Sequence, residues 1–184
     1  MDLKKLIPDY PTHKDYEKYD HLKSFKLPEI SLPNQEGNLL KLNRNDTFKI
    51  VLYCYPMTGR PDRALPDNWN NIKGASGCTA EACSFRDKYD ELISLNAVPI
   101  GISTQSVEDL KEVSQRLSLP YDIISDFDLE FANKLKLPTF KVDNKIYIKK
   151  IILIIEKSYV KKIFYPVNSP TTHINDVLIW LKKN

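Results

Sequence analysis

The sequence predicts an α/β fold, with a mixed central sheet, helices on both faces and an N-terminal β-hairpin. Residues 48–55 form a nearly continuous apolar run, which is typical of a strand buried on both faces. A helical period begins at Thr79. Two late strand-like segments, 146–155 and 159–165, are joined by a tight turn. Alternating strands and helices that end in an antiparallel pair indicate a mixed sheet.

The first part of the chain predicts an extension followed by a hairpin. Residues 1–24 are rich in charged and aromatic residues without a clear period, so we expect an N-terminal extension before a single domain at 25–184. Residues 25–33 alternate between apolar and polar and are interrupted by prolines, as in an edge strand. A turn at 34–37 then leads to a short strand at 39–42.

A long polar loop follows the central strand, from Met57 to Gly77, and loops of this length in compact domains are usually either functional or disordered. The helix after it has an apolar face formed by Ala82, Phe85, Tyr89, Leu92 and Ile93. Ser106 is expected to cap the next helix, through Leu117, because acidic residues occupy its first turn. The other expected elements are strands at 98–103 and 121–125 and helices at 129–135 and 173–181.

Size, charge and cysteine content exclude several classes of protein. The chain has 184 residues with 27 Lys and Arg and 24 Asp and Glu, giving a net charge of +3 without a basic block, so no nucleic-acid partner is expected. The longest apolar run, 151–155, is too short to cross a membrane. The start lacks the apolar region of a signal peptide, and three cysteines do not form a secreted disulfide framework. We therefore expect a soluble, cytoplasmic protein.

The most informative segment contains Cys78 and Cys83, five positions apart and directly after a glycine-bounded turn at 74–77. The first turn of a helix favours an anion through its dipole and its unpaired N–H groups. Such an environment lowers the pKa of a cysteine to ~3.5–7.5, so we expect Cys78 to be a reactive thiolate at neutral pH. Cys54 lies within the buried strand, where a role in packing explains it. No metal is expected, because His13, His21 and His173 are remote in sequence.

The block Gly77-Cys78-Thr79-Ala80-Glu81-Ala82-Cys83-Ser84-Phe85-Arg86-Asp87 resembles the peroxidatic helix of the peroxiredoxins, of the redoxin or AhpC-TSA type. The similarity is to their atypical 2-Cys, monomer-like branch, in which both cysteines lie on one helix. Residues 55–56 and 164–167 resemble other parts of that family. The resemblance implies a thioredoxin-like fold.

The resemblance also implies a reaction: the Cys78 thiolate attacks a hydroperoxide and becomes a sulfenic acid. Cys83 then forms an intramolecular disulfide with it, which thioredoxin or another dithiol reduces. The family requires no cofactor, so the implied partners are the peroxide and the reductant, with no membrane or nucleic acid and a monomer or weak dimer. Five residues of helix rise ~7.5 Å, whereas a disulfide needs Cα atoms within ~7 Å, so the helix must unwind locally.

Two departures from the family pattern concern the site. Ala75 stands where a Thr or Ser usually contacts the peroxide, so Ser76, Thr58 or neither supplies that hydroxyl. Lys150 aligns with the family's late-strand arginine and keeps the charge but not the planar fork, which Arg86 could supply from the helix. The expected catalytic residues are therefore Cys78, Cys83, Arg86 and Lys150, and the expected substrate-binding residues are Pro56, which shields the pocket, Thr58, Ser76 and Gly77.

Two other functions stay open. Pro138-Thr139 could play the part of the cis-proline and threonine that face the redox cysteine of thioredoxin-like thiol-disulfide oxidoreductases. Those enzymes place two residues between their cysteines, however, whereas four stand between Cys78 and Cys83. A redox relay protein that passes on a disulfide is the non-enzymatic alternative. Catalytic consumption of peroxide in the presence of reduced thioredoxin would distinguish the peroxidase from both alternatives.

Overall fold

Five strands form the central sheet of the protein, in the order β5-β4-β3-β8-β9. This computed structural model describes residues 19–167, 169 and 171–184. The strands are β3 (Lys49–Cys54), β4 (Ala97–Ser103), β5 (Ile123–Ser125), β8 (Ile151–Glu156) and β9 (Tyr159–Phe164). Strands β3, β4 and β5 are parallel, whereas β8 is antiparallel to both β3 and β9. The predicted mixed sheet is confirmed.

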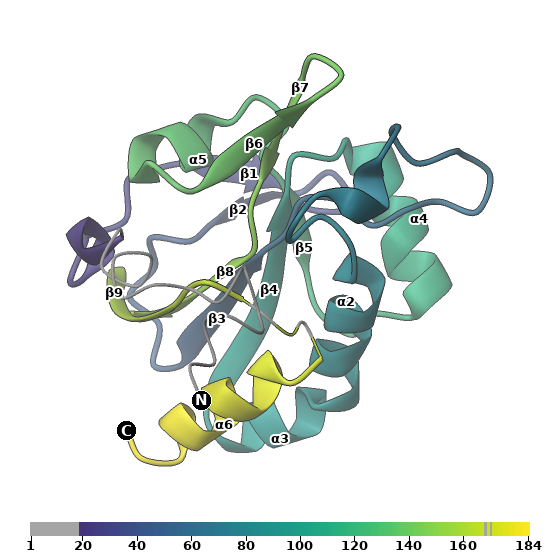
Figure 1. Ribbon diagram of the computed structural model, residues 1–184. Helices are drawn as coiled ribbons and strands as arrows, with labels where there is room; N and C mark the ends of the chain where they lie inside the picture. The colour runs from purple at the N-terminus through teal and green to yellow at the C-terminus, as the bar shows by residue number, and fades with distance from the viewer. Residues whose placement is uncertain (1–18, 168, 170) are drawn as a thin grey trace, which may run out of the picture.

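Helices cover both faces of this sheet, as the sequence predicted. They are α2 (Cys78–Asp87), α3 (Tyr89–Ser94), α4 (Val107–Leu117), α5 (Glu130–Leu135) and α6 (His173–Leu181). One hydrophobic cluster joins α2, α3, α4 and α6 to the sheet, and a second joins α5 and the N-terminal segment to the opposite face. In Figure 1, α3 and α6 accordingly lie below the sheet and α5 lies above it.

The central strand β3 is buried on both faces. Residues 50–54 are each at most 3% exposed, as their continuous apolar run predicts. Side chains alternate across a strand, so Leu52 and Cys54 pack into the cluster on the α5 side, whereas Val51 and Tyr53 pack against α2 and α4. The strand ends beneath the Cys78 segment and carries the chain into the long loop.

The N-terminal hairpin is also confirmed. Strands β1 (Ser31–Pro33) and β2 (Leu39–Lys41) are antiparallel, and Gly37 adopts φ +81° in the turn between them. A single 3₁₀ turn, η2 (Asp20–Leu22), precedes the hairpin and buries Leu22 completely. Most of the expected extension, residues 1–18, lies outside the described residues, so the boundary at residue 25 stays a prediction.

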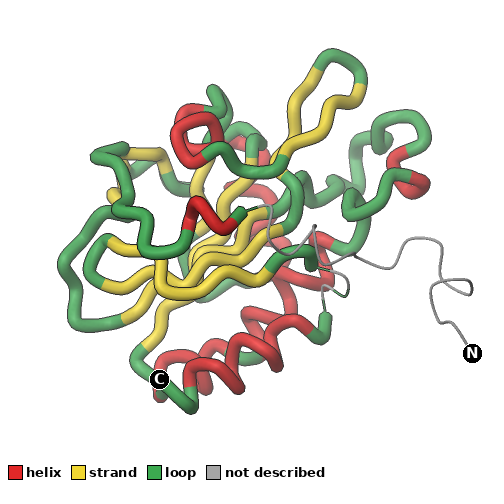
Figure 2. The backbone as a smooth tube through the Cα atoms, turned by 60° about the vertical axis from the view of Figure 1, so that its left-hand side comes forward, coloured by secondary structure: helices red, strands yellow, loops and turns green. Residues whose placement is uncertain are grey.

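The strand expected at 146–155 is divided in two. Strand β7 (Lys145–Ile148) pairs with β6 (Thr139–Val142) in a hairpin that projects from the domain (Figure 2), and β8 begins after a break at Lys149 and Lys150. The break is held by tertiary contacts, because the Lys149 N–H donates to Pro138 O and the Lys150 side chain turns inward. Two consecutive lysines interrupt the apolar residues at this point, and they were the available sequence signal for the break.

The helix expected from Thr79 to Ile93 is divided as well. Lys88, with φ −105° and ψ 10°, separates α2 from α3. The change of direction leaves Ile93 42% exposed, whereas Leu92 stays buried. The prediction that Ile93 belongs to the apolar face was therefore wrong.

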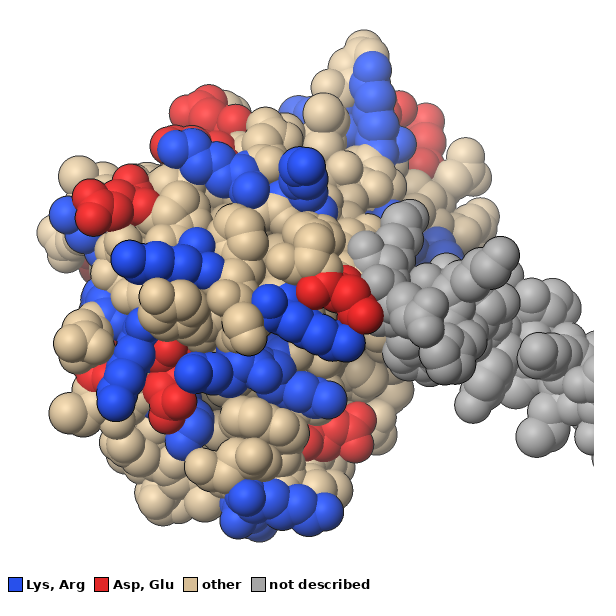
Figure 3. Space-filling view, turned by 90° about the vertical axis from the view of Figure 1, so that its left-hand side faces the viewer, with Lys and Arg blue, Asp and Glu red and all other residues tan. Residues whose placement is uncertain are grey.

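The surface carries mixed charge. Figure 3 shows one face of the molecule, on which basic side chains are interspersed with acidic ones, as the small net charge leads one to expect. Among the described residues, no helix combines the length and apolar character that crossing a bilayer requires.

Candidate active site

Cys78 begins helix α2 directly after two glycines in left-handed conformations. Gly74 adopts φ +82° and Gly77, at the N-cap, adopts φ +85°, which side-chain-bearing residues rarely do. The Glu81 N–H donates to Gly77 O, so the first hydrogen bond of the helix begins at the last residue of the loop. This turn delivers the Cys78 side chain to the interior, where the residue is 3% exposed.

A small hollow of about 190 Å³ lies over Cys78. It is lined by the turn that precedes the helix and by apolar residues of the long loop, among them Met57, Leu65 and Trp69. Trp69, in the 3₁₀ turn η3 (Trp69–Asn71), packs against Tyr147 with ring centroids 5.0 Å apart. The β6–β7 hairpin therefore anchors the loop that forms one wall of the hollow, and Trp69 acts there as a packing residue.

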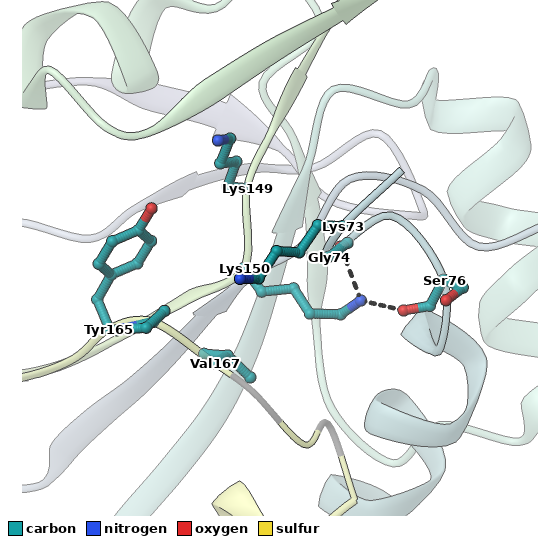
Figure 4. A pocket seen from close by; sticks show the side chains of 8 residues that line it. Lys73, Gly74, Ser76, Lys149, Lys150, Tyr165 and Val167 are labelled. Atoms are coloured by element: carbon teal, nitrogen blue, oxygen red, sulfur yellow. Dashed lines mark hydrogen bonds between the residues drawn. The ribbon is translucent and has the colours of Figure 1, made fainter. Parts of the chain in front are cut away.

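Lys150, in the break between β7 and β8, reaches the same turn from the other side. Its Nζ donates to Gly74 O at 3.1 Å and to Ser76 O, as Figure 4 shows. The residue is 3% exposed and lines a second pocket of about 250 Å³, together with Lys73 and Lys149. From this position the positive charge of Lys150 favours the anion of Cys78 and lowers the pKa of its thiol. The structure thus brings Lys150 and Cys78 together.

The ionisation of Cys78 differs from the expectation. Burial raises the pKa of the Cys78 thiol to about 11, although Lys150 and the Met57 N–H lower it. The thiol donates to Ala75 O at 3.4 Å. The prediction of a lowered pKa was wrong for this conformation, because the removal of water outweighs the nearby positive groups.

Glu81 lies at the same site, and the sequence analysis did not single it out. It stands one helical turn after Cys78, so both side chains lie on the same face of α2. Glu81 is fully buried, and its two carboxylate oxygens have no hydrogen-bond partner among the described residues. Burial raises the pKa of Glu81 to about 8, against the opposing effect of Lys150. Its spacing from Cys78 was the available sequence signal.

Cys83 lies on the same unbroken helix and is half-buried. All three cysteines are free thiols in this structure. Because α2 is continuous from Cys78 to Asp87, the two sulfurs are held on different sides of one helix. The local unwinding needed for a disulfide stays a prediction.

Arg86 lies at the Cys83 end of the helix. Its NH1 donates to Leu117 O at 2.9 Å, and its Nε donates to Asp87 at 2.9 Å. The pKa of Arg86 is raised, first by its hydrogen bond to Asp87 and then by the proximity of Cys83. The structure therefore places Arg86 near Cys83, while the cation that lowers the pKa of Cys78 is Lys150.

The two candidate hydroxyls have different surroundings. The Thr58 hydroxyl donates to Gln105 Oε1 at 3.1 Å, and Thr58 is 1% exposed, so its hydroxyl is committed away from the hollow. Ser76 is exposed and lines the hollow over Cys78, together with Gly77. Pro56 is buried at the end of β3, and its carbonyl accepts from Ser103 at 3.4 Å.

Pro138 and the two described histidines make contacts that support the fold. Pro138 follows a trans peptide bond, and its carbonyl accepts from Lys149 at the start of the break. His21 Nε2 lies 3.0 Å from Leu135 O, and His173 packs at the start of α6 near Phe164. His13 lies outside the described residues. Within the described part of the chain, no three His, Cys, Asp or Glu side chains converge as metal ligands.

Comparisons with known proteins agree with this geometry. The AhpC/TSA family profile matches residues 69–163. The chain is 35% identical over 103 residues to a putative peroxiredoxin bcp of Coxiella burnetii, which covers 56% of this chain and 58% of the relative. It is 32% identical over 107 residues to peroxiredoxin Bcp of Bacillus subtilis, covering 58% of this chain and 59% of the relative. The matches thus span about three fifths of the length of these two relatives.

Solved structures share the fold along most of the chain. Peroxidoxin BcpB from Mycobacterium tuberculosis superimposes with a TM-score of 0.72 at 23% identity, covering 88% of this chain and 96% of that one. A mutant PrxQ from Xylella fastidiosa gives a TM-score of 0.71 at 18% identity, covering 88% and 95%. At these identities the likeness establishes the thioredoxin-like fold that the sequence predicted.

Proposed function

Because the chain belongs to the AhpC/TSA family, we propose that it is a thiol-dependent peroxidase that reduces hydrogen peroxide and organic hydroperoxides. One observation carries the proposal: Cys78 begins α2 beneath a small hollow, and the buried ammonium of Lys150 is hydrogen-bonded to the turn directly before it. The relatives from Coxiella burnetii and Bacillus subtilis are named as peroxiredoxins, which supports the same activity.

The first step oxidises Cys78. Its thiolate attacks the distal oxygen of the peroxide, so a sulfur–oxygen bond forms as the oxygen–oxygen bond breaks. The leaving hydroxide or alkoxide takes up the proton that the thiol gave up and departs as water or alcohol. Lys150 stabilises the anion on sulfur and on the departing oxygen, as a preorganised cation in a water-excluded site does.

The second step joins the two cysteines. The Cys83 thiol attacks the sulfenic acid of Cys78, releasing water and forming a disulfide, once the first turns of α2 have unwound. Thioredoxin or a similar dithiol then reduces this disulfide by thiol–disulfide exchange. Arg86, which lies beside Cys83, is suited to favour the thiolate of the resolving cysteine.

The substrate-binding residues have unequal support in this proposal. Ser76 and Gly77 line the hollow over Cys78, where they can contact a bound peroxide. Pro56 closes the end of β3 behind the site. Thr58 shapes the loop through Gln105, so its contribution is to position the loop wall.

Mass spectrometry after one equivalent of peroxide tests the proposal. In the Cys83→Ser variant, one oxygen atom should be trapped on Cys78, whereas Cys78→Ser should remain unoxidised. The unsubstituted chain should lose two hydrogens as the disulfide forms, and reduced thioredoxin should restore it. Oxidation at equal rates in both variants would contradict the assignment of Cys78.

A thiol-disulfide oxidoreductase or a redox relay remains the alternative. The four-residue spacing between the cysteines and the position of Pro138 at the β6–β7 hairpin favour the peroxidase. The hypotheses differ in the number of peroxide molecules that each chain consumes. The peroxidase consumes many equivalents when thioredoxin is recycled. An oxidoreductase reduces disulfide substrates instead, and a redox relay stops after one equivalent of peroxide.

The proposal includes a cytoplasmic protein that acts as a monomer or weak dimer, with no nucleic-acid partner, membrane or cofactor. It also takes residues 25–184 as the catalytic domain and residues 1–24 as an extension. Tyr19 and Leu22 pack into the core, with exposures of 7% and 0%. A chain that begins at residue 25 should therefore keep its activity but lose stability, which thermal unfolding would measure.

A further inference from the structure

Glu81 is an unusual group to find in the interior of this domain. Of the described side chains, it alone has fully buried polar atoms without a hydrogen-bond partner. A buried ionised carboxylate without hydrogen bonds is costly, so such groups are generally paired or neutral. Its position one turn after Cys78, and its interaction with Lys150, connect it to the proposed active site.

The charges around Glu81 come from few elements. On α2 the neighbouring titratable group is Cys78. At the end of β3 the groups are Tyr53 and Cys54, and Tyr55 follows directly after the strand. Tyr121, before β5, interacts with Glu81 as well. Burial raises the pKa of each of these five groups, so all are neutral at pH 7. The charge that acts on Glu81 is then that of Lys150.

Two acids thus face one cation in a buried space. Lys150 interacts favourably with the anions of both Cys78 and Glu81, whereas each of these anions disfavours the other. A second buried anion beside a single cation would leave one negative charge without a counter-ion. The site therefore accommodates one anion at a time.

We propose that Glu81 controls the ionisation of Cys78 by competing with it for the single positive charge of Lys150. When Glu81 is ionised, Lys150 is already balanced and Cys78 stays a thiol. When Glu81 is protonated, the charge of Lys150 is available to stabilise the Cys78 thiolate instead, so the thiolate forms more readily. The inference rests on the proposed function only in giving this thiolate a role, and Glu81 acts as a positioning residue that does not itself touch the peroxide.

The exchange balances in protons and charge. Cys78 gives up its proton and Glu81 takes it up, so a thiol and a carboxylate become a thiolate and a carboxylic acid. Cys78, Glu81 and Lys150 together carry no net charge, either before or after the exchange. The buried site can then form its nucleophile without a change of net charge in a region from which water is excluded.

The test titrates Cys78 directly. In a Cys54→Ser/Cys83→Ser background, the rate of alkylation by iodoacetamide is measured from pH 6 to pH 12, a range that includes the raised pKa of Cys78. Removing the competing carboxylate with Glu81→Gln should lower the midpoint by about one pH unit, which is roughly a tenfold faster reaction at pH 9, where Glu81 is ionised. At pH 7, where Glu81 is mostly protonated, the two proteins should react at nearly the same rate. The plateau rate at high pH reports access to the sulfur. A loosened helix would hydrate Cys78 and raise the plateau as well as lower the midpoint, so the competition predicts a lower midpoint at an unchanged plateau.

A matched control and a second variant complete the experiment. Glu108→Gln removes the same charge from a side chain that is 78% exposed on α4, and it should leave the midpoint unchanged. Glu81→Met removes the carboxylate without adding a polar group, and it should lower the midpoint in the same direction. Because both substitutions remove an unpaired buried carboxyl, we expect folded proteins.

An unchanged or higher midpoint in a folded Glu81 variant would overturn the inference. Alkylation involves no peroxide, so this outcome is distinct from a failure of the proposed function. If Cys78 does not reduce peroxide, the peroxidase proposal fails, while the titration still shows whether Glu81 and Cys78 compete.

Discussion

Cys54 and Cys78 are both buried thiols, with exposures of 0% and 3%, and they differ in their neighbours. Burial raises the pKa of each, but Cys54 has in addition only the negative groups Asp126 and Glu81, which raise it further. Cys78 has the ammonium of Lys150 and the N–H of Met57. The comparison teaches that burial alone does not make a cysteine inert, because the neighbouring groups decide whether an anion can form.

The largest difference between Cys54 and Cys78 should appear in the peroxidase activity of their variants. Cys78→Ser should reduce peroxide consumption by at least ~10³-fold, because it removes the nucleophile. Cys54→Ser should change the rate by less than about twofold, because Cys54 lies on the opposite side of β3 from Cys78. A coupled assay with reduced thioredoxin measures both, and a comparable loss in the two variants would end the distinction between them.

The second effect concerns Lys150. Lys150→Met removes the cation beside Cys78 and should slow single-turnover oxidation by hydrogen peroxide by about 10–100-fold, as expected when a charged hydrogen-bond donor is lost. Lys150→Arg keeps the charge and should lose less. Lys149→Met, at the neighbouring position, serves as the control and should react at nearly the original rate. If Lys150→Met and Lys149→Met reacted alike, Lys150 would have no role at the sulfur.

The third effect is the pH dependence of stability that Glu81 imposes near both cysteines. Its pKa is raised on folding to about 8, so its contribution is greatest at low pH and is lost as the pH rises through that value. Between pH 6 and pH 8 the unsubstituted chain should lose about 2 kcal/mol of unfolding free energy that Glu81→Gln does not lose. Urea denaturation at both pH values measures this, and parallel behaviour of the two proteins would disprove it.

The smallest effect separates the two cysteines by stability. Cys54→Ser places a hydroxyl in a fully buried apolar strand and should cost about 1–2 kcal/mol. Cys78→Ser should cost less, because its hydroxyl can donate to Ala75 O and accept from the Met57 N–H. Chemical denaturation of both variants would show the difference, and equal losses would mean that the polar surroundings of Cys78 have no effect on stability.

Local sequence signals predicted those features that depend on local chemistry. The buried strand β3 follows from its continuous apolar run, and the Ser106 cap of α4, with its side chain accepting from the Asp109 N–H, follows from the acidic first turn. The position of Cys78 at the start of a helix followed from its glycine turn. In each case neighbouring residues alone determine the outcome.

Features decided by distant residues were not predictable in this way. The Thr58 hydroxyl is taken by Gln105, which lies 47 residues away in sequence. The pKa of Cys78 depends on how deeply the folded chain buries it, which a helix-dipole argument does not include. Glu81 reads in sequence as an ordinary acid in a first helical turn, and only the packing of α2 against β3 shows it to be buried.

Trp69, which forms a wall of the hollow over Cys78, gives the protein a built-in optical probe. The chain has two tryptophans, and the second, Trp180, lies in α6, which Figure 1 shows at the opposite end of the molecule from the β6–β7 hairpin. If the first turns of α2 unwind on oxidation, polar backbone moves beside the Trp69 indole and its emission spectrum changes. Stopped-flow fluorescence of a Trp180→Phe variant would then follow the opening and closing of the helix in real time, without an added label.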